Sequence, residues 1–368
     1  MNKTLDNILD FTGGEKFYRF GNADGKRWIV PARGMHTALN LYQPSGIKGK
    51  MVKKLLPWLH WLPLVRKAIK AQTTNCRLNS ELHAMLCSVF KVQEIEFAIF
   101  EGTPCVHQKI TMQLSCGKRI LGYCKLSDSN NIKALFEKES AMLEWLAGRG
   151  VNNIPQALHC GTMTNGTHIF VQSTAKSASS FIPHEWGTLQ QQFIDKLHCC
   201  TKQRIKFEES DFYRSITALG EHLHWLPGNI DSTTIERGIA IVREQYEGRE
   251  IEFSAYHGDF TPWNMFVEKG RLFVFDFEYA AKSYPPGLDR YHHFTQSAVF
   301  EKHWNDDDFA SYMQTEEAAW IDKSRYLQYL LDVVSHYTMR EGGKVAGKAA
   351  KPFALWGALM MELIIENK

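Results

Sequence analysis

The 368-residue sequence predicts an α+β protein in which a small part rich in β-strands precedes a larger, mostly helical part. Between residues 94 and 172, short runs alternate polar and apolar residues, which is typical of strands, and one helical pattern interrupts them. From about Gln190 onward, apolar residues recur at helical spacing, most clearly over 233–245, 323–339 and 353–365. A tight loop and an apolar strand, between residues 256 and 278, are inserted among these helical blocks.

The composition is that of an ordinary globular protein, with 44% hydrophobic and 23% charged residues. No apolar run reaches the roughly 18 residues of a membrane span, and the first fourteen residues lack the apolar core of a signal peptide. The eight cysteines form no CxxC pair, so we expect reduced thiols. These features favour a cytoplasmic location.

The first eighty residues form a basic N-terminal extension. They carry fourteen Lys and Arg against four Asp and Glu, a net charge of +10, so the rest carries −7 of the total +3. Within 45–70 there are seven Lys and Arg and no acid, and Trp58 and Trp61 stand among leucines. Such a stretch predicts peripheral contact with the inner face of a membrane, or with an anionic glycan or lipid. The alternative is a Pro-broken helix that packs on the neighbouring lobe. No nucleic-acid-binding motif accompanies the charge, so we expect no nucleic-acid partner.

The strand-rich part begins with residues 94–100, is broken at Glu101-Gly102-Thr103-Pro104, and resumes in extended character over 106–114. A further strand over 120–126 carries Lys125 near its end. Two more strands are predicted over 155–161 and 168–172, and the small polar residues 173–180 that follow suit a hinge.

A helix is predicted over 130–148, with Ser129 or Asn130 as its N-cap. Its apolar residues fall on one face, and Glu139 lies on that same side. A buried carboxylate is costly unless it is paired, which makes Lys125 its natural partner. Alternatively, Lys125 is solvated and Glu139 lies on the helix surface.

Two aspartates seventeen residues apart are the most informative feature. Asp259 and Asn264 lie in a tight loop, and an apolar strand over 272–275 leads into Asp276. Hard cations such as Mg²⁺ take oxygen ligands, usually one or two carboxylates together with substrate phosphates. Phosphoryl transfer to a hydroxyl needs an aspartate that accepts the proton, and an Asn and an Asp that hold the metal. The alternative, that both aspartates are ordinary turn and strand-end residues, leaves the spacing of Asn264 unexplained.

These residues resemble the aminoglycoside phosphotransferase and choline kinase superfamily, a branch of the protein-kinase-like fold. The matching segments are His257-Gly258-Asp259, Asn264, Asp276-Phe277-Glu278 and the run from Asp289 to Phe294. Thr261 and Trp263 depart from the pattern, since the family often has His and Gly there. The resemblance covers roughly residues 95–294 and implies a bilobal fold with a small antiparallel-sheet N-lobe and a larger helical C-lobe. The implied division is 1–80 for the extension, 81–176 for the N-lobe and 177–368 for the C-lobe.

The resemblance further implies an ATP- and Mg²⁺-dependent phosphotransferase acting on a hydroxyl of a small molecule, such as a sugar, an aminoglycoside or an amino alcohol. Asp259 would be the catalytic base, and Asn264 and Asp276 the metal ligands. Lys125, oriented by Glu139, would contact the α/β-phosphates. Gly102 would lie in the hairpin over the phosphates, although no GxGxxG is present and an ordinary turn is equally consistent. Two alternatives stay open: a catalytically inactive nucleotide-binding regulator, and a kinase with a lipid-linked or glycan acceptor.

Overall fold

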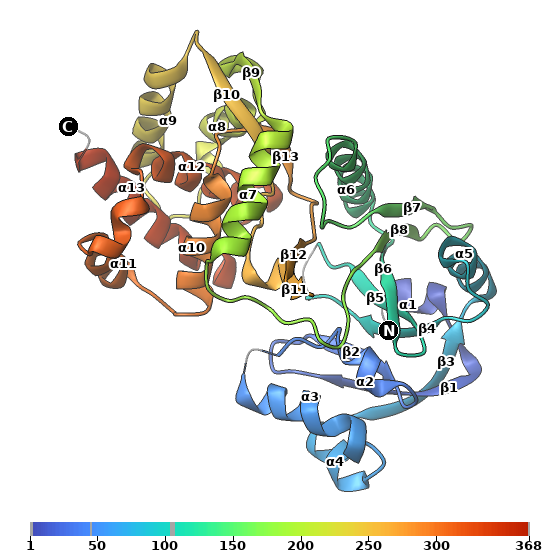
Figure 1. Ribbon diagram of the computed structural model, residues 1–368. Coiled ribbons are helices and arrows are strands. Elements are labelled where there is room, and N and C mark those ends of the chain that lie inside the picture. The colour runs from blue at the N-terminus through green and yellow to red at the C-terminus, as the bar shows by residue number, and fades with distance from the viewer. Residues whose placement is uncertain (1–2, 45, 104–106, 367–368) are drawn as a thin grey trace. The chain divides into compact units, whose positions relative to one another are not determined.

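The computed structural model describes residues 3–44, 46–103 and 107–366, which separate into two compact units (Figure 1). Unit 1 runs to Gly148 and also takes in Asn152–Phe181 and Phe266–Glu278. Unit 2 comprises Arg149–Val151, Ile182–Met265 and the chain from Tyr279 onward. The division confirms the prediction of a sheet-rich part and a mostly helical part.

Among the described residues of unit 1, eight strands form one antiparallel sheet in the order β3-β1-β2-β4-β5-β6-β8-β7. A two-stranded hairpin follows much later in the chain. The sheet strands are β1 (Leu9–Gly21), β2 (Arg27–Pro31), β3 (Gln72–Leu78), β4 (Glu96–Phe100), β5 (Ile110–Cys116), β6 (Arg119–Ser127), β7 (Ala157–Thr162) and β8 (His168–Ser173), and the hairpin strands are β11 (Met265–Glu268) and β12 (Arg271–Val274).

The structure groups the chain differently from the division at residues 80 and 176. Strands β1, β2 and β3 all come from the first eighty residues, and β2 joins them to the rest of the sheet, with Trp28 opposite Phe100 and Ile29 opposite Ile99 on β4. The first eighty residues are thus part of the sheet unit. Local sequence patterns show where strands lie but not which strands pair, because pairing joins residues that are distant in sequence.

The two faces of the sheet carry separate cores. Adjacent strand residues point to opposite faces, so Phe17 lies in one core and Tyr18 in the other. The first core includes Leu82 and Leu86 of one helix, and the second includes Leu56 of another. The helices of unit 1 are α1 (Lys3–Ile8), α2 (Met35–Ala38), α3 (Ile47–Leu59), α4 (Pro63–Ala68), α5 (Ser80–Phe90) and α6 (Asn130–Gly148).

Unit 2 is mostly helical and has one small antiparallel sheet in the order β13-β10-β9. Its core surrounds α12, on which the run Tyr326 to Ser335 is entirely buried. The elements are α7 (Thr188–Thr201), β9 (Gln203–Lys206), α8 (Asp211–Glu221), α9 (Ser232–Tyr246), β10 (Glu250–Tyr256), β13 (Ala281–Tyr284), α10 (Leu288–Phe300), α11 (Asp306–Met313), α12 (Lys323–Arg340) and α13 (Lys351–Glu366), with 3-10 turns at Phe207–Glu209, Leu223–Trp225, Pro262–Asn264, Glu316–Trp320 and Gly347–Ala349.

Most of the predicted elements are confirmed. The helix predicted over 130–148 has those bounds in the structure, and the three C-terminal helical patterns lie within α9, α12 and α13, which extend beyond them by at most two residues at either end. The strand predicted from residue 106 begins at Ile110, and residues 104–106 lie outside the described chain. The described part of segment 45–70, residues 46–70, contains α3 and α4, with Pro57 in the last turn of α3 and Pro63 opening α4. Within the described residues, no helix is long and apolar enough to cross a membrane.

Candidate active site

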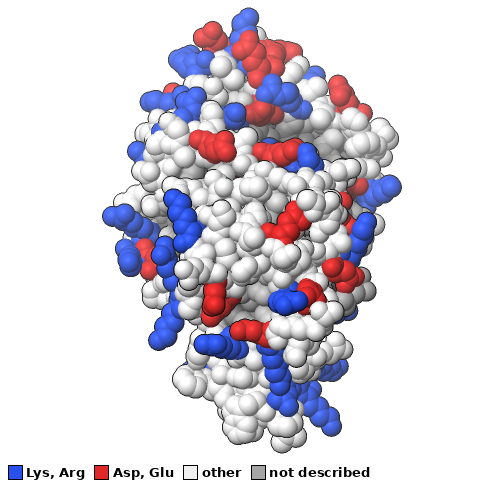
Figure 2. Space-filling view, turned by 90° about the vertical axis from the view of Figure 1, so that its right-hand side faces the viewer, with Lys and Arg blue, Asp and Glu red and all other residues white. Residues whose placement is uncertain are grey.

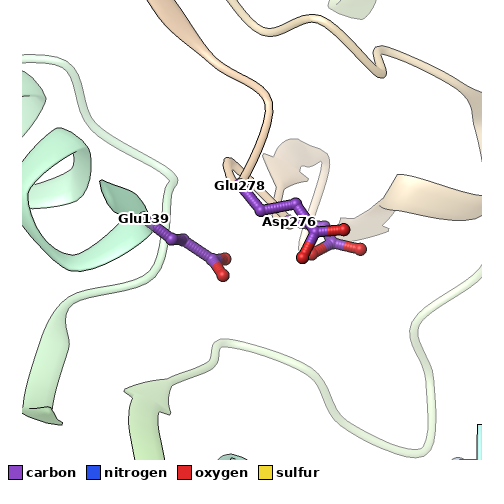
Figure 3. Close-up of side chains that lie close together, drawn as sticks. All are labelled: Glu139, Asp276 and Glu278. Atoms are coloured by element: carbon purple, nitrogen blue, oxygen red, sulfur yellow. The ribbon is translucent and has the colours of Figure 1, made fainter. Parts of the chain in front are cut away.

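Unit 1 contains a cluster of charged side chains built around Lys125 on β6. Its ammonium donates to Oε2 of Glu139 and to Oδ1 of Asp276, at 2.6 Å each. Glu139 comes from α6, and Asp276 and Glu278 follow β12 (Figure 3). The close-up shows the Glu139 carboxylate pointing toward those of the other two. The structure therefore brings three predicted site residues together.

Local structure explains this placement. Lys125 lies opposite Phe170 on β8, and its neighbours Cys124 and Leu126 point into the core on the other face. On α6, Phe136, Glu139 and Leu143 follow helical spacing and are all buried. Burial raises the pKa of Glu139, the charge of Lys125 opposes the rise, and the nearby carboxylates of Asp276 and Glu278 add to it. The short contact between the Lys125 ammonium and Oε2 of Glu139 offsets part of the cost of burying this carboxyl group.

A second lysine, which sequence reasoning missed, completes the cluster. Lys109 donates to Oε2 of Glu278 and lies 3.6 Å from Oδ1 of Asp276. Burial works against its charge, but the carboxylates of Asp276, Glu278 and Glu139 outweigh burial and raise the pKa of Lys109. Two ammonium groups thus face three carboxylates. No local pattern marks Lys109, because Glu278 lies 169 residues further along the chain.

The backbone at Asp276 is held in an uncommon conformation. Its φ of +70° falls in the left-handed region, which few residues other than glycine adopt and which Asp tolerates better than most. The next amide, that of Phe277, donates to Oε1 of Glu139 at 3.3 Å. Glu139 therefore binds both the lysine and the backbone that follows Asp276, and the fully buried Phe277 ring anchors this turn.

The carboxylates of the cluster fit a divalent cation. One oxygen each from Glu139, Asp276 and Glu278 lies within 4.8 Å of the others. Carboxylate oxygens are the ligands that Mg²⁺ and Ca²⁺ prefer, and Mg²⁺ usually needs only one or two of them. Asp276 is the most exposed of the three, with 24% of its side chain accessible.

Gly102 is required by the backbone path. Its φ is +82°, and a Cβ there would come within 2.3 Å of the carbonyl oxygen of Lys109. The glycine thus allows the chain to pass closely beside the residue that carries the second lysine. Residues 104–106 of the same connection lie outside the described chain. This contact explains the glycine, and its predicted role over phosphates stays a prediction.

Three buried polar atoms lie on the same face of the sheet as Lys125. They are Oε1 of Gln113, the hydroxyl of Tyr123 and Oε1 of Gln172, and none has a hydrogen-bond partner. Tyr123 lies opposite both glutamines on β5 and β8 and two residues before Lys125, so these side chains share one face. A buried polar group left unpaired costs about 1–3 kcal/mol. A polar ligand or ordered water beside Lys125 would satisfy these atoms.

In unit 2, the loop of Asp259 is fixed by Asp289 at the start of α10. The Asp289 carboxylate accepts from the amides of His257, at 3.0 and 3.2 Å, and of Gly258, at 3.3 Å. Nδ1 of His257 in turn accepts from the Asp259 amide at 3.2 Å. Gly258 has φ +79°, and a Cβ would come within 2.8 Å of the Tyr279 carbonyl oxygen. Burial raises the pKa of Asp289 to about 7, against the opposing effect of these amides.

Both carboxylate oxygens of Asp259 have partners in this unit. Nδ2 of Asn264 donates to Oδ2 at 2.7 Å and to the Asp259 carbonyl at 3.0 Å. Nε2 of His292, on α10, lies 3.1 Å from Oδ1. His292 is buried, while 31% of the Asp259 side chain is exposed. The structure therefore leaves the carboxylate accessible but restricts its orientation.

His292 was not assigned a role from the sequence, because its contact with Asp259 joins residues 33 positions apart. It lies three residues after Asp289 on one helix, so both side chains share a face directed at the same loop. The neighbouring His293 differs, because burial lowers its pKa to about 4 and keeps it neutral. The predicted residues thus fall into two sets, each described within its own unit: Lys125, Glu139 and Asp276 in unit 1, and Asp259 and Asn264 in unit 2.

An antiparallel sheet with a lysine ion-paired to a helix glutamate, followed by a mostly helical unit, defines the protein-kinase-like fold. The structure is similar to that of a thermostable variant of the aminoglycoside phosphotransferase APH(4)-Ia in ternary complex with ADP and hygromycin B. The TM-score is 0.50 at 11% sequence identity, over 78% of this chain and 98% of that chain. Choline kinase LicA from Streptococcus pneumoniae gives a TM-score of 0.46 at 13% identity, over 77% and 98% of the two chains. No protein-family model matches the sequence, and no curated protein is similar to it.

Proposed function

We propose that this protein is an ATP-dependent phosphotransferase that phosphorylates a hydroxyl of a small molecule, such as a sugar, an aminoglycoside or an amino alcohol like choline. The observation that carries the proposal is the buried lysine of β6, held at 2.6 Å by both Glu139 and Asp276. A fixed ammonium beside a cluster of carboxylates suits the phosphates of a nucleotide and an accompanying cation. The likeness to a fold that binds ADP in a phosphotransferase supports the same conclusion.

In this proposal unit 1 binds the nucleotide. Lys125, oriented by Glu139, contacts the α/β-phosphates, and Gly102 lies in the connection that passes beside Lys109. Tyr123 would offer its ring and hydroxyl to the nucleoside, because it lies two residues before Lys125 on the same face. Asp276 would give an oxygen ligand to Mg²⁺, which would neutralise charge on the phosphates, and the assignment of Asn264, a residue of unit 2, as a second ligand stays a prediction.

Asp259 would accept the proton of the acceptor hydroxyl. As the acceptor oxygen bonds to the γ-phosphorus and the bond to the β-phosphate oxygen breaks, the proton passes to a carboxylate oxygen of Asp259. Asn264 and His292 direct that carboxylate, one at each oxygen. The Asp259 side chain is partly exposed, which leaves room for an acceptor. Asp259 would therefore both orient and deprotonate the acceptor hydroxyl.

Two other functions are compatible with the fold. A regulator that binds nucleotide without turnover would keep the Lys125 cluster but would have no need of a directed Asp259. A kinase with a lipid-linked or glycan acceptor is favoured by one observation, the exposed apolar residues on α3 and α4. Turnover and acceptor specificity separate the three functions.

The test compares Asp259→Asn with Asp195→Asn, a matched change at an exposed position on α7. ATP consumption would be measured against a panel of amino alcohols, aminoglycosides and sugars, and nucleotide affinity by calorimetry. We expect Asp259→Asn to lose about 10²–10⁴-fold in turnover, the usual contribution of a positioned base, with little change in affinity. Full activity in Asp259→Asn would refute the assignment of the base. Nucleotide binding without turnover for any acceptor would identify the regulator instead.

A further inference from the structure

Helices α3 and α4 present a continuous set of exposed apolar side chains. We define the α3–α4 apolar surface by six residues, whose exposed fractions run from 42% for Leu55 to 80% for Leu64: Ile47, Met51, Leu55, Trp58, Trp61 and Leu64. The other large hydrophobic residues exposed in the described chain lie singly or, for the last two on α13, as a pair one turn apart: Leu158, Phe181, Phe300, Met361 and Ile365. Clustered exposed apolar residues of this kind mark an interaction surface.

The surface is one face of a helix that is anchored by its opposite face. Ile47, Met51, Leu55 and Trp58 recur at intervals of four and three, so they form one stripe. Leu56, on the other side of α3, is buried in the core against β1 and β2. The unit 1 fold thus holds α3 in place and leaves the apolar stripe uncovered by described residues.

The connection between the helices is ordered by polar contacts. The indole of Trp61 donates to the carbonyl of Trp58 at 3.0 Å. Nη1 of Arg66 donates to the carbonyls of His60 and Trp61, at 3.2 and 2.8 Å. The Trp58 ring lies edge-on to His36 at 4.8 Å. Both tryptophans are therefore fixed outward, and little conformational freedom is lost when the surface is covered.

Cationic side chains border this apolar stripe. By helical spacing, Lys48 lies on one side of it and Lys54 on the other, and both are exposed. Lys50, Lys67 and Lys70 are exposed as well, and residues 45–70 contain no acid. Lys53 is excluded from this set, because burial lowers its pKa and it lies on the packed side. At the bottom of Figure 2, where α3 and α4 lie by their height in Figure 1, Lys and Arg border an uncharged surface.

We propose that the α3–α4 apolar surface docks on an anionic phospholipid bilayer. Helices that lie in the membrane interface have an apolar face that enters the acyl boundary, with Trp and Leu, and Lys or Arg beside it that reach the lipid phosphates. All of these features are present on α3 and α4. A second copy of this chain is a poor occupant, because the same cationic border would face itself. The proposal is independent of the phosphotransferase function.

The structure predicts two separable parts to this binding. The lysines contribute an electrostatic part that salt weakens, and the apolar residues contribute a part that salt does not weaken. Each basic residue near an anionic membrane strengthens binding about fivefold, so the loss of three attractions lowers the partition coefficient by about a hundredfold. Repulsion from the three new carboxylates lowers it further.

The experiment is co-sedimentation of the full chain with vesicles of phosphatidylcholine alone, or with phosphatidylglycerol added, at low and high salt. Three variants are compared with the wild type. The border variant, Lys48→Glu/Lys50→Glu/Lys54→Glu, reverses the charge of three lysines beside the apolar stripe. The apolar variant, Ile47→Gln/Leu64→Gln, removes the two most exposed apolar side chains of the surface. The control variant, Lys118→Glu/Lys196→Glu/Lys202→Glu, changes the net charge by the same amount as the border variant, at exposed positions outside α3 and α4. Circular dichroism verifies that each variant is folded.

We expect the wild type and the control variant to bind anionic vesicles at low salt and to bind less at high salt. The border variant should lose binding by about a hundredfold or more, and the apolar variant should lose the fraction that remains bound at high salt. Wild type that stays in the supernatant with anionic vesicles would overturn the proposal. So would equal losses in the border and control variants, or a concentration-dependent dimer that Ile47→Gln/Leu64→Gln abolishes.

Discussion

Replacing Lys125 with Met should destabilise unit 1 strongly. Methionine keeps the length of the side chain but removes the ammonium from Glu139 and Asp276, which it contacts at 2.6 Å each. Lys125 is 5% and Glu139 0% exposed, so Glu139 would be left as a buried charge without its main partner. Removing one member of a buried ion pair costs about 3–5 kcal/mol. The contact of Lys125 with Asp276 contributes less to this loss of stability, because water reaches the Asp276 carboxylate.

The loss is large compared with a total stability of about 5–15 kcal/mol for a typical folded domain. With a urea dependence of about 2–3 kcal/mol per molar, the unfolding midpoint should fall by roughly 1–2 M. The matched control is Lys133→Met, which breaks an exposed ion pair with Glu137 on α6. Exposed pairs of this kind contribute little, so the control should unfold with the wild type.

A double variant tests the cause of the loss. Lys125→Met/Glu139→Gln should recover part of the stability, because a neutral amide no longer leaves a buried charge uncompensated. Urea titration of the three variants, followed by circular dichroism and fluorescence, gives the comparison. If Lys125→Met unfolded at the same urea concentration as Lys133→Met, the ion pair would not be the stabilising interaction inferred from the geometry.

Two further predictions concern unit 2. His292→Ala should lower kcat by about 10–100-fold with little change in the KM for nucleotide, since a hydrogen bond to a charged group contributes about 1.5–3 kcal/mol. His292→Asn should recover part of the rate, because it restores a hydrogen-bond donor to Asp259. A change in KM alone would contradict a role of His292 in directing the base. Asp289→Asn removes a carboxyl whose pKa is raised to about 7, so its stabilising contribution is complete below about pH 4 and is lost as the pH rises through 7. The wild type should therefore lose stability relative to Asp289→Asn between pH 4 and 7, by at most about 1.4 kcal/mol per pH unit. Parallel urea titrations of both proteins at several pH values measure this. If the Asp289 carboxyl did not titrate in that range, the difference in unfolding free energy between the two proteins would stay constant.

Asp259 and Lys125 could both be found from the sequence, because each stands in a local sequence pattern. Lys125 lies near the end of a short, mostly apolar strand, and Glu139 falls on the apolar side of a helical repeat. Asp259 and Asn264 belong to one short loop whose spacing is visible in the chain. These patterns also predict the order of strands and helices, since side-chain periodicity follows directly from backbone geometry.

Contacts between distant residues could not be found in this way. The pairing of β2 with β4 brings the first eighty residues into the sheet, although nothing local distinguishes it from other pairings. Lys109 meets Glu278, and His292 meets Asp259 across 33 residues. The sequence by itself determined where apolar residues repeat at strand or helix spacing, and it placed Asp259 and Asn264 in one loop. The tertiary structure alone decided which strands share a sheet, which second lysine joins the cluster and which histidine holds the carboxylate, because those contacts form only when separate segments pack together.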